Sequence, residues 1–325
     1  MERHPKIIYM GTPEFAAGPL KALLEAGYEI PAVVTVPDKP KGRGLQMSQS
    51  DVKKFIVEYN SQHGTGIDIL QPEKLRDENF LSHLKSYGAD LFIVVAFRML
   101  PEVVWKMPKM GTFNLHASLL PKFRGAAPIN WAIIRGEKET GVTTFFIDDK
   151  IDTGNILLQK TTTINERETV ETLHDRLMEM GSKLVVETVQ GLETGSITPK
   201  PQDISLLTES TSAAPKLNKE NTRIVWSKTA EEVDALVRGL SPYPAALTTM
   251  ETGSGEKIEM KVFSTELTGK KGGKTTITGK AIYVPCSDSL LEITSLQPAG
   301  KKRMGALDFI NGHKNLVGDE SIRFF

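Results

Sequence analysis

The chain has 325 residues, enough for two domains of ordinary size, and its 40 basic residues equal its 40 acidic ones. A balanced charge gives no general affinity for polyanions, so any nucleic-acid site must be a local basic patch. The single cysteine, Cys286, excludes an internal disulfide and suits a reducing compartment. No apolar run reaches the roughly 18 residues of a membrane helix, and the N-terminus shows no signal-peptide pattern. We therefore expect a cytoplasmic protein without membrane association.

The first part of the chain alternates short β-rich runs with helical patterns. Strands are predicted at residues 6–10, 30–36, 90–96, 111–116 and 142–147, and helices at 130–135 and 169–192. Between the first strand and the next helix, Thr12 is predicted as the N-cap and Pro13 as the first helical residue. Strands that alternate with helices are typical of an α/β domain with a mainly parallel sheet. We expect a Rossmann-like domain over residues 1–192.

The composition changes after this domain. Residues 193–222 are rich in Gly, Thr, Ser, Pro, Lys and Asn with little periodicity, which is typical of a linker. A helix is predicted at 229–240, followed by β-like runs at 257–263, 281–285 and 290–294. Roughly five short strands in about a hundred residues favour a small β-barrel of the OB type. We expect this barrel over residues 223–325.

Two polar residues share one side of the strand predicted at 111–116. Asn114 and His116 are two positions apart, so on extended chain their side chains point the same way. Both can donate hydrogen bonds to one oxygen, which is what a tetrahedral oxyanion requires. On this pair alone, a hydrogen-bonded loop histidine with a neighbouring asparagine remains the favoured interpretation.

A second polar cluster, residues 148–155, follows the strand predicted at 142–147 and contains Asp152. A carboxylate at the carboxyl end of a strand lies where α/β folds build their sites. An aspartate beside a histidine orients the imidazole ring. Taken alone, however, Asp-Thr-Gly is more often an ordinary turn.

Together the two clusters resemble the signature of the 10-formyltetrahydrofolate-dependent formyltransferases. The similarity covers Asn114-Leu-His-Ala-Ser-Leu-Leu-Pro121 and Ile151-Asp-Thr-Gly154, and continues through Arg124-Gly-Ala-Ala-Pro128 and Gly141-Val-Thr143. The resemblance implies that Asn114, His116 and Asp152 are the catalytic trio. Asn114 and a protonated His116 would stabilise the oxyanion, while Asp152 would orient His116 and accept the amine proton.

The resemblance also implies the co-substrate. The formyl donor would be 10-formyltetrahydrofolate, and no metal is expected. The folate slot would be lined by Phe113, Leu115, Ser118, Leu119, Leu120 and Pro121, with Val95, Ala96 and Phe97 on the opposite wall. A nucleotide cofactor is not expected, because Gly11-Thr-Pro-Glu-Phe15 lacks the second and third glycines of a dinucleotide fingerprint.

The acceptor is suggested first by a basic loop. Lys39, Lys41 and Arg43 lie on the Pro/Gly-rich segment 37–44, where basic side chains can meet phosphates. In isolation such a loop is more often simply solvated. Its position and Gly-Arg-Gly core resemble the loop with which tRNA-formylating members of the family enter the acceptor stem. Those members often carry further lysines where this chain has Leu45 and Gln46. We therefore expect the loop of this chain to bind tRNA more weakly or through differently distributed contacts.

The C-terminal part adds a second indication. Lys270, Lys271 and Lys301 lie in basic clusters suited to phosphate, although lysines on β-turns can equally serve solubility. Four segments, at 213–220, 224–227, 238–244 and 305–312, resemble the linker and C-terminal domain of the tRNA-formylating branch. The resemblance thus implies transfer of the formyl group to the amino group of methionyl-initiator tRNA, for translation initiation. We expect the protein to be a monomer.

Other acceptors remain open at this point. A sugar-nucleotide N-formyltransferase would share the trio and could carry a similar second domain. Glycinamide ribonucleotide is less favoured, because enzymes for that acceptor are usually shorter, and formyltetrahydrofolate hydrolysis is disfavoured by the lack of a fused dehydrogenase domain. A non-catalytic RNA-binding protein would not be expected to retain Asn114, His116 and Asp152 together.

Overall fold

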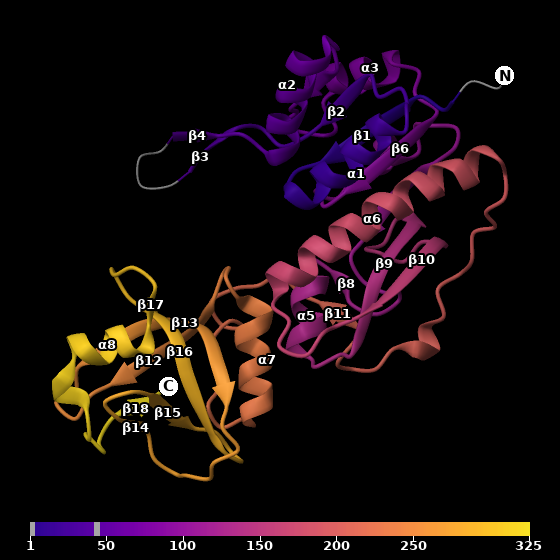
Figure 1. Cartoon of the computed structure of the whole chain (residues 1–325). Helices are drawn as coiled ribbons and strands as arrows, with labels where there is room; N and C mark the ends of the chain where they lie inside the picture. Colours follow the sequence, from indigo (N-terminus) through magenta and orange to yellow (C-terminus); the bar gives the residue numbers. More distant parts are fainter. Residues whose placement is uncertain (1–3, 42–45) are drawn as a thin grey trace. The chain divides into compact units, whose positions relative to one another are not determined.

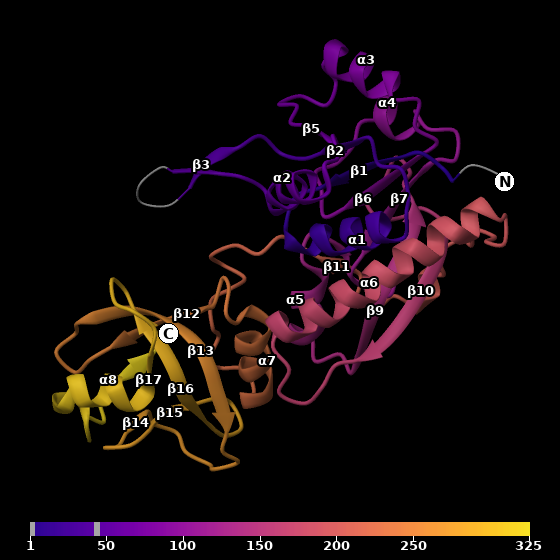
Figure 2. The ribbon, with the colours of Figure 1, turned by 45° about the horizontal axis from the view of Figure 1, so that its top comes forward.

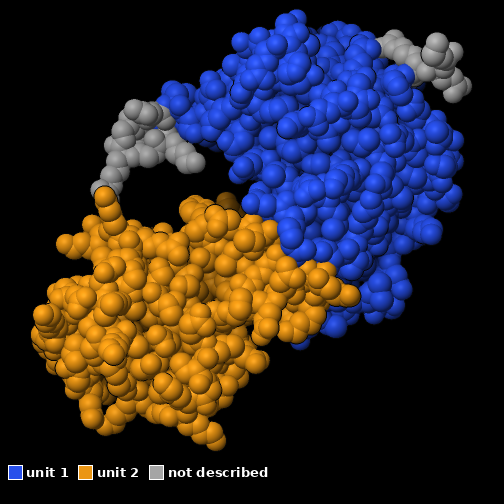
Figure 3. All heavy atoms as spheres, in the orientation of Figure 1, with its two compact units in different colours: residues 1–124, 141–162, 174–212 blue, residues 125–140, 163–173, 213–325 orange. Residues whose placement is uncertain are grey.

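The computed structural model describes residues 4–41 and 46–325. The described chain divides into two compact units, shown in different colours in Figure 3. The first unit comprises residues 1–124, 141–162 and 174–212, and the second comprises 125–140, 163–173 and 213–325. Both units are therefore assembled from segments that alternate along the sequence.

The first unit is built on a seven-stranded sheet (Figure 1). Its strands are β1 (Ile7–Gly11), β2 (Ala32–Val34), β5 (Asp68–Leu70), β6 (Leu91–Val95), β7 (Thr112–His116), β9 (Glu139–Phe146) and β10 (Ile156–Thr163), in the order β10-β9-β7-β6-β1-β2-β5. The central pairs β5-β2, β2-β1, β1-β6 and β6-β7 are parallel, whereas β7 and β9 are antiparallel. The strand order reverses between β1 and β6, which is where ligands bind in open α/β sheets.

Helices cover both faces of this sheet (Figure 2). The helices are α1 (Glu14–Glu25), α2 (Asp51–His63), α3 (Glu78–Ser86), α4 (Glu102–Trp105) and α6 (Val170–Glu193). Residues Ile204–Leu206 form the 3-10 turn η1. Ile8 and Met10 of β1 pack in one buried cluster with Phe80 of α3 and Val104 of α4. On the other face, the hydroxyl of Tyr9 donates a 2.6 Å hydrogen bond to the Ala16 carbonyl of α1. The two faces follow from the alternation of side chains along β1.

A short hairpin belongs to the first unit, and a two-stranded pairing lies in the second unit except for Arg124. The hairpin consists of β3 (Lys39–Lys41) and β4 (Gln46–Ser48), which pair antiparallel. The other pair is β8 (Arg124–Gly125) with β11 (Ala213–Ala214).

The second unit contains an antiparallel sheet and three helices. Its elements are α5 (Pro128–Ile134), α7 (Ala230–Leu240), β12 (Ala246–Glu251), β13 (Lys257–Leu267), β14 (Thr276–Ile277), β15 (Ile282–Pro285), β16 (Leu290–Pro298), β17 (Met304–Gly305), α8 (Ala306–Gly312), the 3-10 turn η2 (Lys314–Leu316) and β18 (Arg323–Phe324). The strand order is β14-β15-β16-β13-β12-β18, and β17 pairs with β16. The curled sheet forms a half-barrel around an apolar core.

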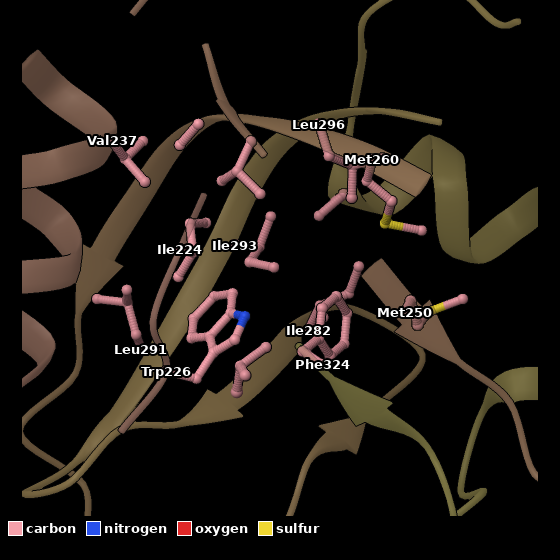
Figure 4. Packing of buried hydrophobic residues seen from close by; sticks show 14 of the residues in the cluster. Ile224, Trp226, Val237, Met250, Met260, Ile282, Leu291, Ile293, Leu296 and Phe324 are labelled. Atoms are coloured by element: carbon pink, nitrogen blue, oxygen red, sulfur yellow. The ribbon is translucent and has the colours of Figure 1, made fainter. Parts of the chain in front are cut away.

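Aromatic and aliphatic side chains fill the core of the second unit (Figure 4). Trp226 contacts Phe324 edge to face at 5.8 Å between ring centroids, and its indole N–H donates to Thr248 Oγ1 at 2.9 Å. The one polar atom of this large side chain is therefore satisfied inside the core. Val237 of α7 and Ile293 of β16 belong to the same cluster, so the helix is part of the core.

The predicted fold class is confirmed: a Rossmann-like α/β sheet is followed by a small antiparallel β structure. The predicted start of the first helix is wrong by one residue, because Pro13 is the N-cap of α1 and no side chain caps it. Thr12 lies before the cap, and its carbonyl accepts the backbone N–H groups of Asp51 and Val52 at the start of α2. In the described residues, no helix combines the length and apolarity needed to cross a membrane.

Candidate active site

Strand β7 carries Asn114 and His116 at the carboxyl end of the parallel part of the sheet. His116 is 7% exposed, and its Nε2 lies 2.8 Å from the carbonyl oxygen of Phe123. A carbonyl can only accept, so Nε2 carries a hydrogen and donates it. Phe123 is held with φ of 57°, and its own N–H donates to the Thr211 carbonyl at 2.7 Å. The second ring nitrogen, Nδ1, is therefore the one that can take part in chemistry.

Asp152 is brought to this second nitrogen. Its Oδ2 lies 3.8 Å from Nδ1 of His116, which is an ion-pair distance but longer than a hydrogen bond. Both side chains are largely buried, at 8% and 18% exposure. Asn114 is half-buried, and its amide has no hydrogen-bond partner in the described part of the chain. The site thus combines a free amide donor, an oriented imidazole and a carboxylate.

The Asp152 loop is held by Gln202, which lies outside the sequence motif, and by Arg124, which lies within it. Asp152 has φ of 54°, a left-handed conformation that Asp tolerates better than most residues. The amide of Gln202 donates to the carbonyls of Asp152 at 2.8 Å and Gly154 at 2.9 Å. The guanidinium of Arg124 donates to Gln202 Oε1 at 2.6 and 3.1 Å. Gln202 lies in a segment without periodicity, so no local sequence signal could have identified it.

The Asp-Thr-Gly turn also requires its glycine. A Cβ added at Gly154 would lie 1.7 Å from the Phe146 carbonyl oxygen, far inside van der Waals contact. The carboxylate of Asp148 accepts from the hydroxyl of Thr153 at 2.7 Å and from the N–H of Lys150 at 3.0 Å. These contacts fix the turn on which Asp152 sits.

The segment after His116 is fixed by a buried network of hydrogen bonds. The hydroxyl of Thr143 donates to the Ser118 carbonyl at 2.7 Å and accepts from the Leu120 N–H at 3.2 Å. The amide of Gln159 donates to Thr143 Oγ1 and to the Leu120 carbonyl at 2.9 and 2.8 Å. Ser118 is fully buried and donates its hydroxyl to the Lys122 carbonyl at 2.6 Å, so that hydroxyl closes a turn. Thr143 and Gln159 were not among the predicted site residues.

The other residues predicted for a folate slot lie in different environments. Ala96, with φ of 45°, is exposed, Phe97 and Leu119 are partly exposed, and Val95, Leu120 and Pro121 are buried. Phe113 and Leu115 are buried and lie on the side of β7 opposite to Asn114 and His116. Leu115 contacts Gly181 of α6, where an added Cβ would meet its Cδ2 at 2.8 Å.

The basic residues predicted to meet tRNA are mostly exposed where the structure describes them. Lys39, Lys271 and Lys301 are exposed, and Lys270 lies over the ring of Tyr283 at 4.9 Å. Arg43 and the side chain of Lys41 lie outside the described residues. Among the residues with described side chains, no group of three His, Cys, Asp or Glu residues is placed to hold a metal ion.

Comparison with known proteins bears on this arrangement of residues. The sequence profile described as "Formyl transferase" matches residues 5–189, and the profile "Formyl transferase, C-terminal domain" matches residues 216–314. The methionyl-tRNA formyltransferase of Parabacteroides distasonis is 48% identical over 96% of this chain and 97% of its own length. That of Flavobacterium johnsoniae is 46% identical over 94% of this chain and 96% of its own.

Solved structures share the fold. The N-formyltransferase from Helicobacter canadensis, in complex with folinic acid and dTDP-3-aminofucose, superposes with a TM-score of 0.62 at 20% identity, covering 92% of this chain and all of that one.

Proposed function

We propose, from the premise that this chain belongs to the formyl transferase family, that it transfers the formyl group of 10-formyltetrahydrofolate to the amino group of methionyl-initiator tRNA. The relatives that bear the name methionyl-tRNA formyltransferase match it over nearly their whole length, whereas the sugar N-formyltransferase is distant in sequence. The reaction serves translation initiation. We further propose that the protein acts as a cytoplasmic monomer.

One observation carries the assignment of the catalytic residues. The Phe123 carbonyl engages Nε2 of His116, so Nδ1 is left beside Asp152, on the strand side that also carries Asn114. Because Nε2–H already donates to Phe123, His116 can donate to an oxyanion only as the doubly protonated ring proposed for it, through the hydrogen on Nδ1. The 3.8 Å separation between Nδ1 and Asp152 Oδ2 is too long for a hydrogen bond, so in the protonated ring Nδ1–H would be available to the substrate oxygen.

The three side chains then have distinct roles. The amine nitrogen of the methionyl group attacks the formyl carbon, and the formyl oxygen becomes negative. The amide of Asn114 and Nδ1–H of His116 donate to that oxygen, and each such donor typically contributes about a hundred- to a thousandfold in rate. Asp152 accepts the proton that the amine loses, directly or through a water. When the bond from the formyl carbon to N10 breaks, N10 takes up a proton and the formamide is released.

The remaining residues support the donor and the acceptor. We propose that the exposed or partly exposed Ala96, Phe97 and Leu119 contact the folate. The buried Val95, Leu120 and Pro121 would support the walls of the folate slot. Phe113, Leu115 and Ser118 would position the catalytic strand and the turn that follows it.

Residues 1–192 would carry out the chemistry, residues 193–222 would link the two domains, and residues 223–325 would bind tRNA with Lys270, Lys271 and Lys301. Lys39, Lys41 and Arg43 would meet the acceptor stem.

An acceptor screen tests this function. The purified protein would be given 10-formyltetrahydrofolate with either methionyl-tRNA or an amino-sugar nucleotide, and transfer of a labelled formyl group would be measured. We expect methionyl-tRNA to be formylated and the sugar nucleotide to remain unmodified. Transfer to the sugar alone would establish the competing function, a sugar-nucleotide N-formyltransferase.

A further inference from the structure

The hairpin β3–β4 carries Lys39 and Lys41 away from the sheet of the first unit, beyond α2 and β2 (Figure 1). Three residue pairs hold its strands together: Lys39 with Ser48, Pro40 with Met47, and Lys41 with Gln46. A two-stranded ribbon of this length is marginal by itself in water. Its direction must therefore be set by the residues at its base.

Three side chains form a closed hydrogen-bonded cluster at that base. Nζ of Lys53, on α2, donates to Asp38 Oδ2 at 2.6 Å and to Gln71 Oε1 at 2.8 Å. The amide nitrogen of Gln71 donates to Asp38 Oδ1 at 2.8 Å and to the Val36 carbonyl at 2.8 Å. Every member thus contacts the other two, and one bond reaches the backbone just before the hairpin. The hydrogen bonds from Lys53 and Gln71 also lower the pKa of Asp38, so the cluster contains a carboxylate at neutral pH.

Further hydrogen bonds fix the start of α2, which carries Lys53, and the segment that follows Gln71. Ser50 caps α2 by accepting from the Lys53 N–H at 3.1 Å, and it receives the hydroxyl of Thr35 at 2.7 Å. On the other side, Arg98 donates to the Glu73 carbonyl at 2.8 Å and to the Pro72 carbonyl, immediately after Gln71. The first strand of the hairpin is thus anchored through Asp38, and the second through the capped start of α2.

We infer that Asp38, Lys53 and Gln71 are positioning residues that hold the hairpin β3–β4 in the orientation in which its basic side chains meet the acceptor stem of tRNA. The inference rests on the function proposed above. A preformed hairpin spares the complex the cost of ordering it, because the apparent affinity is proportional to the fraction of molecules already in the binding conformation.

The substitution Asp38→Asn separates this role from simple electrostatics. It removes a negative charge next to a basic hairpin, so charge alone would strengthen binding to a polyanion. Loss of the cluster would instead loosen the hairpin. We expect the KM for methionyl-tRNA to rise about tenfold, while kcat at saturating tRNA and the KM for 10-formyltetrahydrofolate stay within about twofold.

A second variant and a matched control complete the experiment. Gln71→Met breaks the same cluster without changing any charge, and it decides the outcome if circular dichroism shows that Asp38→Asn does not fold. Lys54→Met removes a cation from the same helix, but within residues 4–41 and 46–325 the ion pair of Lys54 is with Asp51 alone, at 2.9 Å on the exposed side. We expect Gln71→Met to behave like Asp38→Asn, and Lys54→Met to leave the KM for tRNA within about twofold.

Each result then has one meaning. Unchanged or tighter tRNA binding in both cluster variants would overturn the inference and leave the proposed function standing. Equal losses of kcat and of folate affinity would show that the cluster only stabilises the fold, which would also overturn it. If the unsubstituted protein does not formylate methionyl-tRNA, the proposed function fails, and the inference fails with it.

Discussion

A single backbone carbonyl decides which nitrogen of His116 can act in the proposed reaction. The Phe123 oxygen, 2.8 Å from Nε2, fixes a hydrogen on that nitrogen and directs Nδ1 toward Asp152. Phe123 can present its carbonyl in this way because it adopts φ of 57° and is anchored through the Thr211 carbonyl. The active geometry therefore depends on backbone seven residues beyond the histidine.

At Asp152, the substitution Asp152→Asn tests the carboxylate without disturbing the turn. Asparagine tolerates the left-handed conformation at φ of 54° as well as aspartate does, so the loop should keep its shape. We expect kcat to fall by a hundredfold or more, because the amide cannot accept the amine proton, while folate affinity changes little. Single-turnover transfer and equilibrium folate binding measure the two effects.

The neighbouring carboxylate supplies the control for this substitution. Asp149 is exposed in the same loop, so Asp149→Asn removes one charge at nearly the same place in the sequence. We expect it to retain near-normal turnover. If Asp152→Asn also retained near-normal turnover, Asp152 would have no part in the mechanism.

Among the elements, the turn between β9 and β10 shows why the motif contains glycine. The added Cβ at Gly154 would overlap the Phe146 carbonyl at 1.7 Å, and backbone cannot move aside as the end of a side chain can. We expect Gly154→Ala to destabilise the protein by about 3 kcal/mol and to abolish transfer. Urea unfolding and the formylation rate measure these changes. Gly66→Ala is the control, because an added Cβ there meets nothing within 4 Å; equal stability of the two variants would refute the steric argument.

Helix α7 is held in the second unit by a buried carboxylate. Asp234 is 2% exposed and accepts from Arg167 at 2.8 Å, Arg238 at 2.7 Å and the Thr265 hydroxyl at 2.7 Å. Arg238 also donates to the Glu168 carbonyl at 3.0 Å. The cluster thereby joins the segment at 163–173 to α7 and β13 within this unit.

Removing this carboxylate should therefore be costly. Asp234→Ala would leave two guanidinium groups and a buried hydroxyl without their shared acceptor, and we expect a loss of about 3 kcal/mol in the free energy of unfolding. Glu231→Ala, at an exposed position of the same helix, should change it by less than about 0.5 kcal/mol. A loss at Asp234 no larger than at Glu231 would show that the cluster adds no stability.

The sequence predicts those features that depend on local pattern. Period-two alternation puts Asn114 and His116 on one side of a strand, and the helix predicted at 229–240 agrees with α7 (Ala230–Leu240). The structure adds that the side chains of Thr229 and Glu232 form a capping box at its start. The partners of the site could not be predicted in this way. Gln202 donates a hydrogen bond to the Asp152 carbonyl although the two residues are 50 positions apart in the sequence. The local composition around either residue does not indicate such a contact.

The structure differs from the sequence prediction at two further places, residues 37–44 and Thr12, for the same physical reason. Residues 37–44 have the Pro and Gly content of a loop, yet Lys39–Lys41 forms a strand because it pairs with Gln46–Ser48. Thr12 has the side chain of an N-cap, but its carbonyl accepts from the start of α2, and the helix begins after Pro13. Tertiary hydrogen bonds override local preference in both places.

For the whole molecule, the second unit does not follow from the order of the sequence. Helix α5, from the middle of the chain, belongs to this unit, and Asn130 donates to the Gly239 carbonyl of α7 at 2.7 Å. Gly239 permits this approach, because an added Cβ would lie 2.6 Å from the Ile134 side chain. A fragment beginning at residue 223 would therefore lack α5 and the segment at 163–173, which both contact α7.

Discrimination between two methionyl-tRNAs tests the acceptor proposed for this protein. Methionyl-initiator tRNA and methionyl-elongator tRNA carry the same amino acid, so kcat/KM with 10-formyltetrahydrofolate would be measured for each under identical salt. We expect formylation of both amines by the same catalytic residues, but with initiator tRNA favoured at least tenfold in kcat/KM. Equal kcat/KM for the two tRNAs would contradict the assignment.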